Sequence, residues 1–386
     1  MTTTKSRTGD PIEIRRVDAR SWWERRKFLT FPWRIYEDDP LWVPPLLPQL
    51  DERIDPDRGV FFDHGQADFF MAYRGGEPVG TICAGEDYFK NESKEQKDCV
   101  FGFFEVIEDY TVAEALLNRA IAWAEGRGLD ALFGPFNLDY EDSYGVLIEG
   151  RERPPALLCG HTPSYYQGFL ERFGCEPARG DNLAYKIDLG QDSSQLKRLS
   201  RLGDYLRRKE WIEIRGANLD EWDTELDRIH RLLNAALAHL PDHMGWHRDD
   251  LEESLQPFRD LADPELVLFA EVEGETVGWF PAIPDLNEAL IKANGLRYPW
   301  DYVRLWWAMR QDLEWLTIKS VLVLPEYWQT GVSVLLFDEM RKRARERGYR
   351  WVDLSLTGAD NPFTPDLAER LGAELYKRYR VYRYYL

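Results

Sequence analysis

Apolar and polar residues alternate along the first half of the chain in runs that predict strands and amphipathic helices. A strand is predicted over 12–17, and a hairpin over 68–84 turns at Gly75-Gly76. The run 101–106 is almost entirely apolar, as in a buried strand, and helical spacing follows over 112–125. The first half is therefore expected to contain both strands and helices.

The second half predicts the same mixture. A hairpin is expected over 266–280, with its turn at Gly274. A buried-type strand over 321–324 breaks at Pro325, and a further strand is expected over 351–356. Between them lies a helix, because apolar residues recur with helical spacing at 332, 335, 336, 340 and 344.

The two halves resemble each other at a fixed spacing. The hairpin segment 72–80 stands 198 positions before 270–278, and the two share Ala, Gly, Glu, Val and Gly. The segment 171–174 stands 198 positions before 369–372, and both contain Glu-Arg followed by a terminal Gly. Two matches at one spacing, with the same order of elements between them, indicate an internal duplication.

The duplication predicts two domains. We place their boundary in the polar stretch that begins at residue 190, which gives an N-terminal domain of residues 1–190 and a C-terminal domain of residues 191–386. Each half follows the order β–α–β–β–β–α–β–α–β. The predicted fold class is therefore α/β (α+β).

Composition and charge exclude several classes of function. The chain of 386 residues carries 68 acidic and 49 basic residues, a formal net charge of −19. Such a chain is a poor binder of nucleic acids and anionic membranes, so we expect neither as a partner. The four cysteines form no CxxC pair and no metal-ligand spacing with the six histidines, so we expect free thiols and no metal. No run reaches the ~20 apolar residues of a membrane helix, and no apolar signal core is present, which favours the cytoplasm.

The turn after the strand 321–324 carries the first chemical signal. A strand, a turn with Gly331 and a helix follow one another directly. The first amides of a helix have no partner within the helix, so a helix start of this kind is suited to hold an anion such as a pyrophosphate. The alternative is an ordinary buried strand packed by an ordinary helix.

This turn resembles the cofactor-binding loop of the GNAT acyltransferases, Arg/Gln-x-x-Gly-x-Gly/Ala. Gly331 matches the first glycine, whereas Trp328 replaces the Arg or Gln and Ser333 replaces the second small residue. Nearly the whole chain also resembles a group of tandem GNAT-like proteins of bacteria. The motifs that carry this second resemblance are Phe31-Pro32, Ile35-Tyr36, Trp42 to Leu46, Gly102 to Glu105, Gly134 to Asn137 and Tyr376 to Tyr382.

The resemblance implies two tandem GNAT-like domains, each a mixed, mostly antiparallel sheet with a splayed central parallel pair flanked by helices. In the second domain, strands 321–324 and 351–356 would form that pair and hold the pantetheine of acetyl-CoA or another acyl-CoA. The residues implied to bind this co-substrate are Leu322 and Leu324 through their backbone, the amides of Gln329, Thr330, Gly331, Val332 and Ser333, and Asn361. Asn361 is explained equally well as a turn residue, because Asn-Pro commonly starts a turn.

The first domain departs from the family pattern at the corresponding turn. The connection 107–111 contains no glycine and carries Glu108 and Asp109. Two carboxylates at this place would repel a pyrophosphate by roughly 1 kcal/mol or more each. We therefore expect the first domain not to bind CoA in the usual manner.

Acyl transfer to an amine needs a base that accepts a proton and an acid that protonates the leaving thiolate. The tyrosine that the family often uses as the acid is absent from both halves, where Leu170 and Ala368 stand. The candidate catalytic residues are Glu326, just after a strand, and Glu105, on a buried-type strand. The structural alternatives are a solvated loop acid for Glu326 and a helix-capping or arginine-paired acid for Glu105.

These observations predict a CoA-dependent N-acyltransferase that transfers an acetyl group to an amine of a small molecule or peptide. In this hypothesis the second domain binds the donor and both domains shape the acceptor site. One alternative is a degenerate GNAT-like protein that binds a ligand or a partner without transfer. Another is a Fem-like aminoacyl or peptidyl transferase, although the basic surface that tRNA requires conflicts with a net charge of −19.

Overall fold

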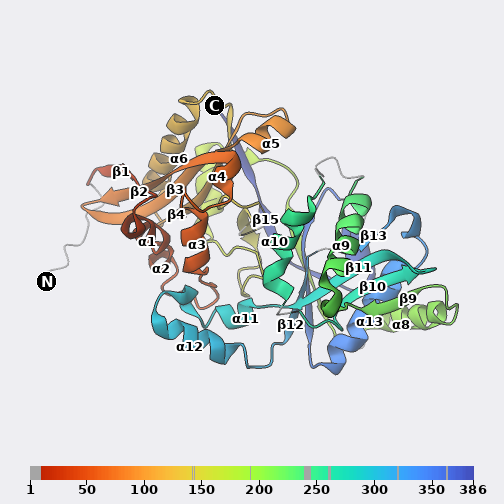
Figure 1. Ribbon diagram of the computed structural model, residues 1–386. Coiled ribbons are helices and arrows are strands. Elements are labelled where there is room, and N and C mark those ends of the chain that lie inside the picture. Colours follow the sequence, from red (N-terminus) through yellow and green to blue (C-terminus); the bar gives the residue numbers. More distant parts are fainter. Residues whose placement is uncertain are drawn as a thin grey trace. The chain divides into compact units, whose positions relative to one another are not determined.

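The computed structural model describes residues 10–140, 142, 144–191, 193–238, 245–259, 262–319, 321–361 and 364–386. The chain forms two compact units (Figure 1). Unit 1 contains Met1–Asn182, Ala289–Arg310 and Lys377–Leu386, and unit 2 contains Leu183–Glu288 and Gln311–Tyr376. The units differ from the contiguous halves 1–190 and 191–386. Residues 289–310 and 377–386 of the second half belong to unit 1, and residues 183–190 of the first half belong to unit 2.

Unit 1 is built on a seven-stranded sheet with the order β1-β2-β3-β4-β5-β16-β7. Its strands are β1 (Ile12–Arg16), β2 (Gly65–Arg74), β3 (Glu77–Asp87), β4 (Asp98–Val106), β5 (Ala131–Gly134), β7 (Glu176–Pro177) and β16 (Tyr382–Tyr385). All neighbouring strands are antiparallel except β4 and β5, which are parallel. The short strand β6 (Val146–Glu149) pairs with residues 378–380.

The helices of unit 1 include one long helix that covers the sheet. They are α1 (Trp22–Leu29), α2 (Pro32–Ile35), α3 (Leu47–Arg53), α4 (Phe61–His64), α5 (Tyr88–Ser93), α6 (Tyr110–Glu125), α7 (Tyr165–Phe173), the 3-10 turn η2 (Asn294–Leu296) and α12 (Pro299–Ala308). Along α6, Val112, Leu116 and Ala120 recur every four residues and are fully buried in the core. Burial of each large apolar side chain contributes about 1.5–3 kcal/mol, which explains why this helix holds the sheet.

Unit 2 repeats the plan with the strand order β15-β8-β14-β12-β11-β10-β9, and β13 pairs with β11. Its strands are β8 (Asn182–Asp188), β9 (Glu213–Gly216), β10 (Val267–Val272), β11 (Glu275–Pro284), β12 (Trp315–Ile318), β13 (Leu322–Val323), β14 (Trp351–Gly358) and β15 (Glu374–Arg380), of which β15 continues into unit 1. Its helices are α8 (Ser194–Arg207), η1 (Leu219–Glu221), α9 (Trp222–Ala236), α10 (Arg248–Arg259), η3 (Pro325–Tyr327), α13 (Val332–Glu346) and α14 (Thr364–Arg370), and α11 (Asn287–Leu290) crosses the unit boundary. The sequence predicts a helix over about 222–240, and residues 239 and 240 of that range lie outside the described residues.

Each sheet contains the final strand of the other half of the chain. The last strand of the chain, β16, pairs with β5 and β7 in unit 1. The last strand of the first half, β8, lies between β14 and β15 in unit 2. The segments 182–188 and 380–386 stand 198 positions apart, as do the repeated motifs. The two halves have therefore exchanged equivalent strands.

The duplication is also visible in how a strand packs against its helix. A Cβ atom at Gly80 of β3 would lie 2.7 Å from Leu116 and 3.2 Å from Val112 of α6. A Cβ atom at Gly278 of β11 would lie 3.1 Å from Leu336 and 3.2 Å from Val332 of α13. In both units a glycine thus lets the helix approach the sheet closely, against a Val and a Leu four residues apart. The tandem arrangement of two mixed sheets with flanking helices, as expected from the sequence, is confirmed.

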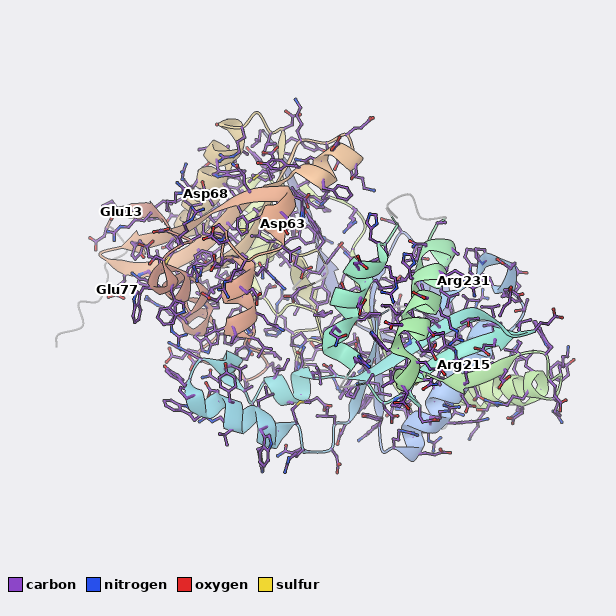
Figure 2. All side chains as sticks on the ribbon, viewed as in Figure 1. Glu13, Asp63, Asp68, Glu77, Arg215 and Arg231 are labelled. Carbon is purple, nitrogen blue, oxygen red and sulfur yellow. The ribbon has the colours of Figure 1, made fainter. Side chains whose placement is uncertain are left out.

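Buried acids in each unit are paired with arginines or other donors. In unit 2, Arg215 on β9 contacts Glu225 of α9 at 2.7 Å and Glu271 of β10 at 2.7 Å (Figure 2). In unit 1, Asp68 of β2 accepts hydrogen bonds from Arg16 and from the indole of Trp123, so it ties β1 and α6 to the sheet (Figure 2). The four cysteines are buried free thiols, as expected. In the part of the chain that the structure describes, no helix combines the length and apolar character that crossing a bilayer requires.

The glycine in the middle of β4 offers a test of the fold. A Cβ atom at Gly102 would lie 1.6 Å from the carbonyl oxygen of Phe136, in the turn that follows β5. The Gly102→Ala variant must therefore move one backbone segment away from the other, which we expect to cost about 1–3 kcal/mol or more. Thermal unfolding followed by circular dichroism should show a melting temperature lower by several degrees.

The matched control is Gly168→Ala on α7, where a Cβ atom would meet nothing within 4 Å. Alanine is the better helix former by about 1 kcal/mol, so this variant should melt at the wild-type temperature or above it. Equal melting temperatures for Gly102→Ala and the wild type would show that the two backbone segments do not approach each other closely.

Candidate active site

The central parallel strands of unit 2 part after four residues. Trp315 to Ile318 of β12 pair with Trp351 to Leu354 of β14, whereas β14 continues to Gly358. Beyond Ile318 the chain turns away, and β13 pairs with β11 on the other side. The sequence named 321–324 and 351–356 as the splayed central pair. In the structure β12 supplies the hydrogen-bonded part of that pair, and 321–324 is the arm that leaves β14. We call this divergence of β13 from β14 the fork of unit 2.

The segment between β13 and α13 leads directly from the fork to a helix N-terminus. Pro325 to Tyr327 form the turn η3, and Gly331 is the N-cap of α13 with a φ of 98°. Only glycine adopts this left-handed conformation without strain, which explains the glycine at this position. No side chain caps α13 within the described residues, so the amides of Val332 and Ser333 start a helix that lacks a side-chain acceptor.

The residues of β13 whose backbone faces the fork are not the two that the sequence implied, Leu322 and Leu324. The amide of Leu324 donates to the carbonyl of Val277 at 2.9 Å, so it points towards β11. Because successive residues of a strand direct their backbone groups to opposite sides, Leu322 faces the same way and Val323 faces the fork. The indole Nε1–H of Trp328 donates to the carbonyl oxygen of Val323 at 2.8 Å. Trp328, which stands where the family loop has Arg or Gln, thus occupies one backbone acceptor of the fork.

The other residues of unit 2 that the sequence implied in binding or catalysis differ in exposure and in hydrogen bonding. Gln329 is exposed, and the hydroxyl of Thr330 donates to the carbonyl of Tyr327 at 2.7 Å, so Thr330 stabilises the turn. Asn361 follows β14, and its amide donates to the carbonyl of Gly358 at 3.0 Å, so it closes the turn that ends this strand. Glu326 lies on η3 and is exposed, without the burial that would tune a carboxylate for catalysis.

The equivalent helix start in unit 1 is closed. Asp109 is the N-cap of α6, where its carboxylate accepts from the amide of Thr111 at 2.9 Å and contacts Arg74 at 2.6 Å. Partial burial acts to raise the pKa of Asp109, but the hydrogen bonds from Thr111 and Arg74 hold it below its usual value. A carboxylate therefore occupies the place that an anion would take.

The parallel pair of unit 1 also parts, but the gap is bridged. Pairing of β4 with β5 ends at Val100 and Phe133. Beyond it, the amide of Phe136 donates to the carbonyl of Phe101 at 2.8 Å, and the side chain of Asn137 accepts from the amide of Phe103 at 2.7 Å. The turn Gly134 to Asn137, noted as a sequence motif, therefore binds the bulged part of β4.

This bulge directs Glu105 into a cluster of tyrosines in unit 1. The hydroxyl of Tyr166, on α7, donates to the carboxylate of Glu105 at 2.7 Å and accepts from the amide of Val106 at 2.9 Å. Tyr166 and Tyr36 are almost fully buried, whereas Glu105 is partly exposed. Burial raises the pKa of Glu105 to about 7, against the hydrogen bond from Tyr166, which lowers it. A carboxyl whose pKa is raised to about 7 is suited to accept a proton near neutral pH.

The residues of the N-terminal motifs complete this cluster. Tyr36 stacks on Trp42 with ring centroids 4.7 Å apart, and its hydroxyl donates to the carbonyl of His161 at 3.0 Å. His161 in turn contacts the carboxylate of Asp39 through Nε2 at 2.8 Å. Burial lowers the pKa of His161, while Asp39 opposes that shift. Tyr36 was noted in the sequence only as part of a family motif, and its role beside Glu105 depends on the fold.

A second set of buried acids, on the strands of unit 2, was not found in the sequence. Asp353 of β14 is fully buried and accepts hydrogen bonds from Thr317 at 3.0 Å and Tyr376 at 2.6 Å. Asp285, at the end of β11, is also buried, and burial together with the charge of Asp353 raises its pKa to about 7. The sequence signal would have been an acid in the middle of an apolar strand, which Trp351 to Leu356 contains at its third position. Among the described residues, no three His, Cys, Asp or Glu side chains gather so as to hold a metal ion.

Comparison with known proteins identifies the same plan elsewhere. The model of the acetyltransferase (GNAT) family matches residues 21–138 and 226–373. The bacterial ceramide synthase of Caulobacter vibrioides is 29% identical over 370 residues, which cover 93% of this chain and 94% of that protein. Protein YghO of Escherichia coli is 26% identical over 362 residues, which cover 92% of each chain.

Solved structures share the fold at low sequence identity. A tandem GNAT protein from the clavulanic acid biosynthesis pathway, solved without AcCoA, superposes with a TM-score of 0.56 at 12% identity and covers 97% of this chain and 98% of its own. A GCN5-related N-acetyltransferase from Sphaerobacter thermophilus superposes with a TM-score of 0.53 at 14% identity, covering 97% and 95%. Because the family model matches two separate regions that together span more than half of the residues, this chain belongs to the acetyltransferase (GNAT) family, with two such domains in tandem.

Proposed function

We propose that this protein is a CoA-dependent N-acyltransferase whose acyl donor binds at the fork of unit 2. The observation that carries the proposal is the contrast between two equivalent helix starts. In unit 1 the start of α6 is capped by Asp109 and the diverging strands are bridged by Phe136 and Asn137. In unit 2 the start of α13 is Gly331, which leaves backbone amides for a pyrophosphate beside parted strands.

The proposed reaction joins the acyl carbon to a nitrogen. The neutral amine attacks the thioester carbonyl, a C–N bond forms, and the C–S bond of the acyl-CoA breaks. The nitrogen loses one proton to a base, and the leaving thiolate of CoA takes up one proton from an acid or from water. The products are an amide and free CoA.

Each unit contains one candidate base, Glu105 in unit 1 and Asp285 in unit 2. Burial raises the pKa of both carboxyls to about 7. A carboxyl with such a pKa is suited to accept a proton near neutral pH. The pH dependence of the reaction distinguishes Glu105 from Asp285.

The acceptor that we propose is a long-chain amine, and the donor an acyl-CoA longer than acetyl-CoA. Support comes from the relative named bacterial ceramide synthase, which aligns over 93% of this chain. A ceramide is an amide between a fatty acid and a long-chain amino alcohol, which is the product class of the reaction above. The test is the formation of the amide from palmitoyl-CoA and a long-chain amino alcohol, followed by mass spectrometry, with acetyl-CoA and a short amine as comparisons.

The Ser333→Glu variant tests the donor site. A carboxylate in the first turn of α13 would repel the phosphates, by roughly 1–4 kcal/mol depending on exposure, yet an acid there suits the helix dipole and leaves the fold intact. We expect the dissociation constant of acyl-CoA, measured by calorimetry, to rise at least about tenfold.

The control is Gln195→Glu, which adds the same charge in the first turn of α8, in the same unit. It should bind acyl-CoA as the wild type does. If wild type releases no heat with CoA, acetyl-CoA or palmitoyl-CoA, or if both variants bind equally well, the fork of unit 2 is not the donor site.

The pH dependence of the reaction tests the base. Glu105 accepts a proton only when it is ionised, so the rate should rise with pH through a midpoint of about 7 and level off above it. Tyr166→Phe removes a hydrogen bond that lowers the pKa of Glu105, so the midpoint should move to higher pH. Glu105→Gln should lower the rate by about 10²–10⁴.

Two variants control for structural effects. Tyr165→Phe also removes a hydroxyl that bonds to the backbone of β4, at the carbonyl of Val106, but not one that bonds to Glu105. Asp285→Asn removes the other acid whose pKa is about 7. Both should keep the midpoint of the wild type, and a midpoint that follows Asp285 instead would exclude Glu105 as the base.

A second function is favoured by one observation. The bond from Trp328 to Val323 occupies a backbone acceptor of the fork, as expected for a protein that binds a ligand without transferring it. Saturable binding of acyl-CoA without release of CoA, in the presence of a range of amines, would support this second function over acyl transfer.

A further inference from the structure

The helix α12 of unit 1 has an aromatic outer face. Five of its ten residues are large, apolar and more than half exposed: Trp300, Tyr302, Val303, Trp306 and Trp307. Their exposed fractions run from 53% to 65%. A surface helix of a globular protein normally buries its apolar side chains and exposes its polar ones. In α12 this distribution is reversed.

The inner face of the same helix shows that the reversal is built into the structure. Asp301 is fully buried, and its carboxylate accepts from the amide of Tyr298 at 2.9 Å and from the side chain of Asn294 at 3.1 Å. Ala308, two turns later, is also buried. A polar N-cap network and a small residue thus fix the orientation of α12, and that orientation turns the tryptophans outwards.

The charge of this segment also differs from that of the chain. Ala289–Arg310 contains the cations Lys292, Arg297, Arg304 and Arg310 and the single acid Asp301, so its formal charge is +3, whereas the whole chain carries −19. Arg304 and Arg310 are exposed, and the guanidinium of Arg310 lies 3.7 Å from the ring centroid of Trp306. Asp301, the only acid of the segment, is buried and contacts the guanidinium of Arg304 at 3.1 Å, so the segment keeps a net positive charge beyond this pair.

The N-terminus of α1 extends this surface. Trp22 and Trp23 are 44% and 76% exposed. Trp22 and Arg26 of α1 line, together with Leu296 and Tyr302, a recess of about 310 Å³, to which Asp51 and Arg58 contribute one charge of each sign. The aromatic surface is therefore formed by two helices that are distant in the sequence and adjacent in unit 1. We call Trp22, Trp23 and the exposed residues of α12 the aromatic surface.

We propose that the aromatic surface docks unit 1 onto an anionic phospholipid bilayer. Tryptophan and tyrosine prefer the interface between lipid headgroups and acyl chains, because each has an apolar body and a polar tip. A helix whose apolar face is flanked by arginines, and whose net charge is positive, is the kind that lies in the plane of an anionic membrane. The net charge of the chain led us to expect no membrane partner, but the membrane would meet this local surface and not the average over the molecule.

This inference is independent of the proposed function, because docking requires neither acyl-CoA nor Glu105. It bears on that function in one way: a long-chain amine partitions into bilayers, and a protein held at the bilayer would meet it there.

Sedimentation with vesicles measures the docking directly. The full chain is mixed with vesicles of phosphatidylcholine alone and with vesicles that also contain phosphatidylglycerol. We expect binding to the mixed vesicles and weaker binding to phosphatidylcholine, by about fivefold for each cation near the surface. The Trp306→Ala/Trp307→Ala double variant should bind the mixed vesicles at least about tenfold more weakly than the wild type, because two large side chains no longer enter the interface.

The control for the tryptophans is Tyr88→Ala/Phe89→Ala, which removes two adjacent exposed aromatic side chains of α5 in the same unit. It should bind as the wild type does. For charge, Arg304→Gln/Arg310→Gln should reduce the preference for phosphatidylglycerol, whereas Arg201→Gln/Arg208→Gln, at exposed positions of unit 2, should not.

Three results would overturn the proposal. The first is that wild type binds neither kind of vesicle. The second is that the tryptophan variant binds as tightly as wild type. The third is that the wild type forms a dimer in gel filtration and does not sediment with vesicles, while the tryptophan variant is a monomer. That result would assign the aromatic surface to contact with a second copy of the chain.

Discussion

A short parallel strand pair at the centre of each sheet is the feature on which the remaining structure depends. Parallel strands need a helical crossover between them, and in both units that crossover helix, α6 or α13, begins where the pair parts. In each unit the segment that leaves the parallel pair therefore leads to the N-terminus of that helix. We propose that a helix start left open provides a site for an anionic ligand and that a filled one does not.

The two units differ in what lies between the parted strands and at the helix N-terminus. Unit 1 fills the divergence with the turn after β5 and caps its helix with Asp109, and the bulge that results in β4 places Glu105 among buried tyrosines. Unit 2 keeps a glycine at the helix start and leaves the strands parted, while Trp328 covers one acceptor. In the function that we propose, duplication separates two demands that conflict in one site: a carboxyl whose pKa is raised, and backbone amides for a phosphate.

The aromatic surface shows the limit of arguments from total charge. Electrostatic interactions between exposed groups are screened over about 10 Å in physiological salt, so a partner responds to the charges near its contact. The segment 289–310, which the duplication does not explain, brings both the tryptophans and the positive charge to unit 1. A segment of the second half of the chain therefore forms part of the surface of unit 1, which is built mainly from the first half.

Local pattern by itself determined the hairpins, the strand–turn–helix at Gly331 and the duplication at a spacing of 198, because these features depend on neighbouring residues and on turn chemistry. It also indicated that Glu108 and Asp109 would repel a pyrophosphate at the first helix start, whereas the capping of α6 by Asp109 came from the structure. The partner of each strand was decided only by the tertiary structure. The sequence period of a strand is the same for every possible neighbour, so it did not reveal that β12 and not 321–324 pairs with β14, or that β8 and β16 exchange units. The cluster around Glu105 and the orientation of α12 were likewise beyond local pattern, because Tyr36, Tyr166 and Asp301 acquire their roles from long-range packing and buried hydrogen bonds.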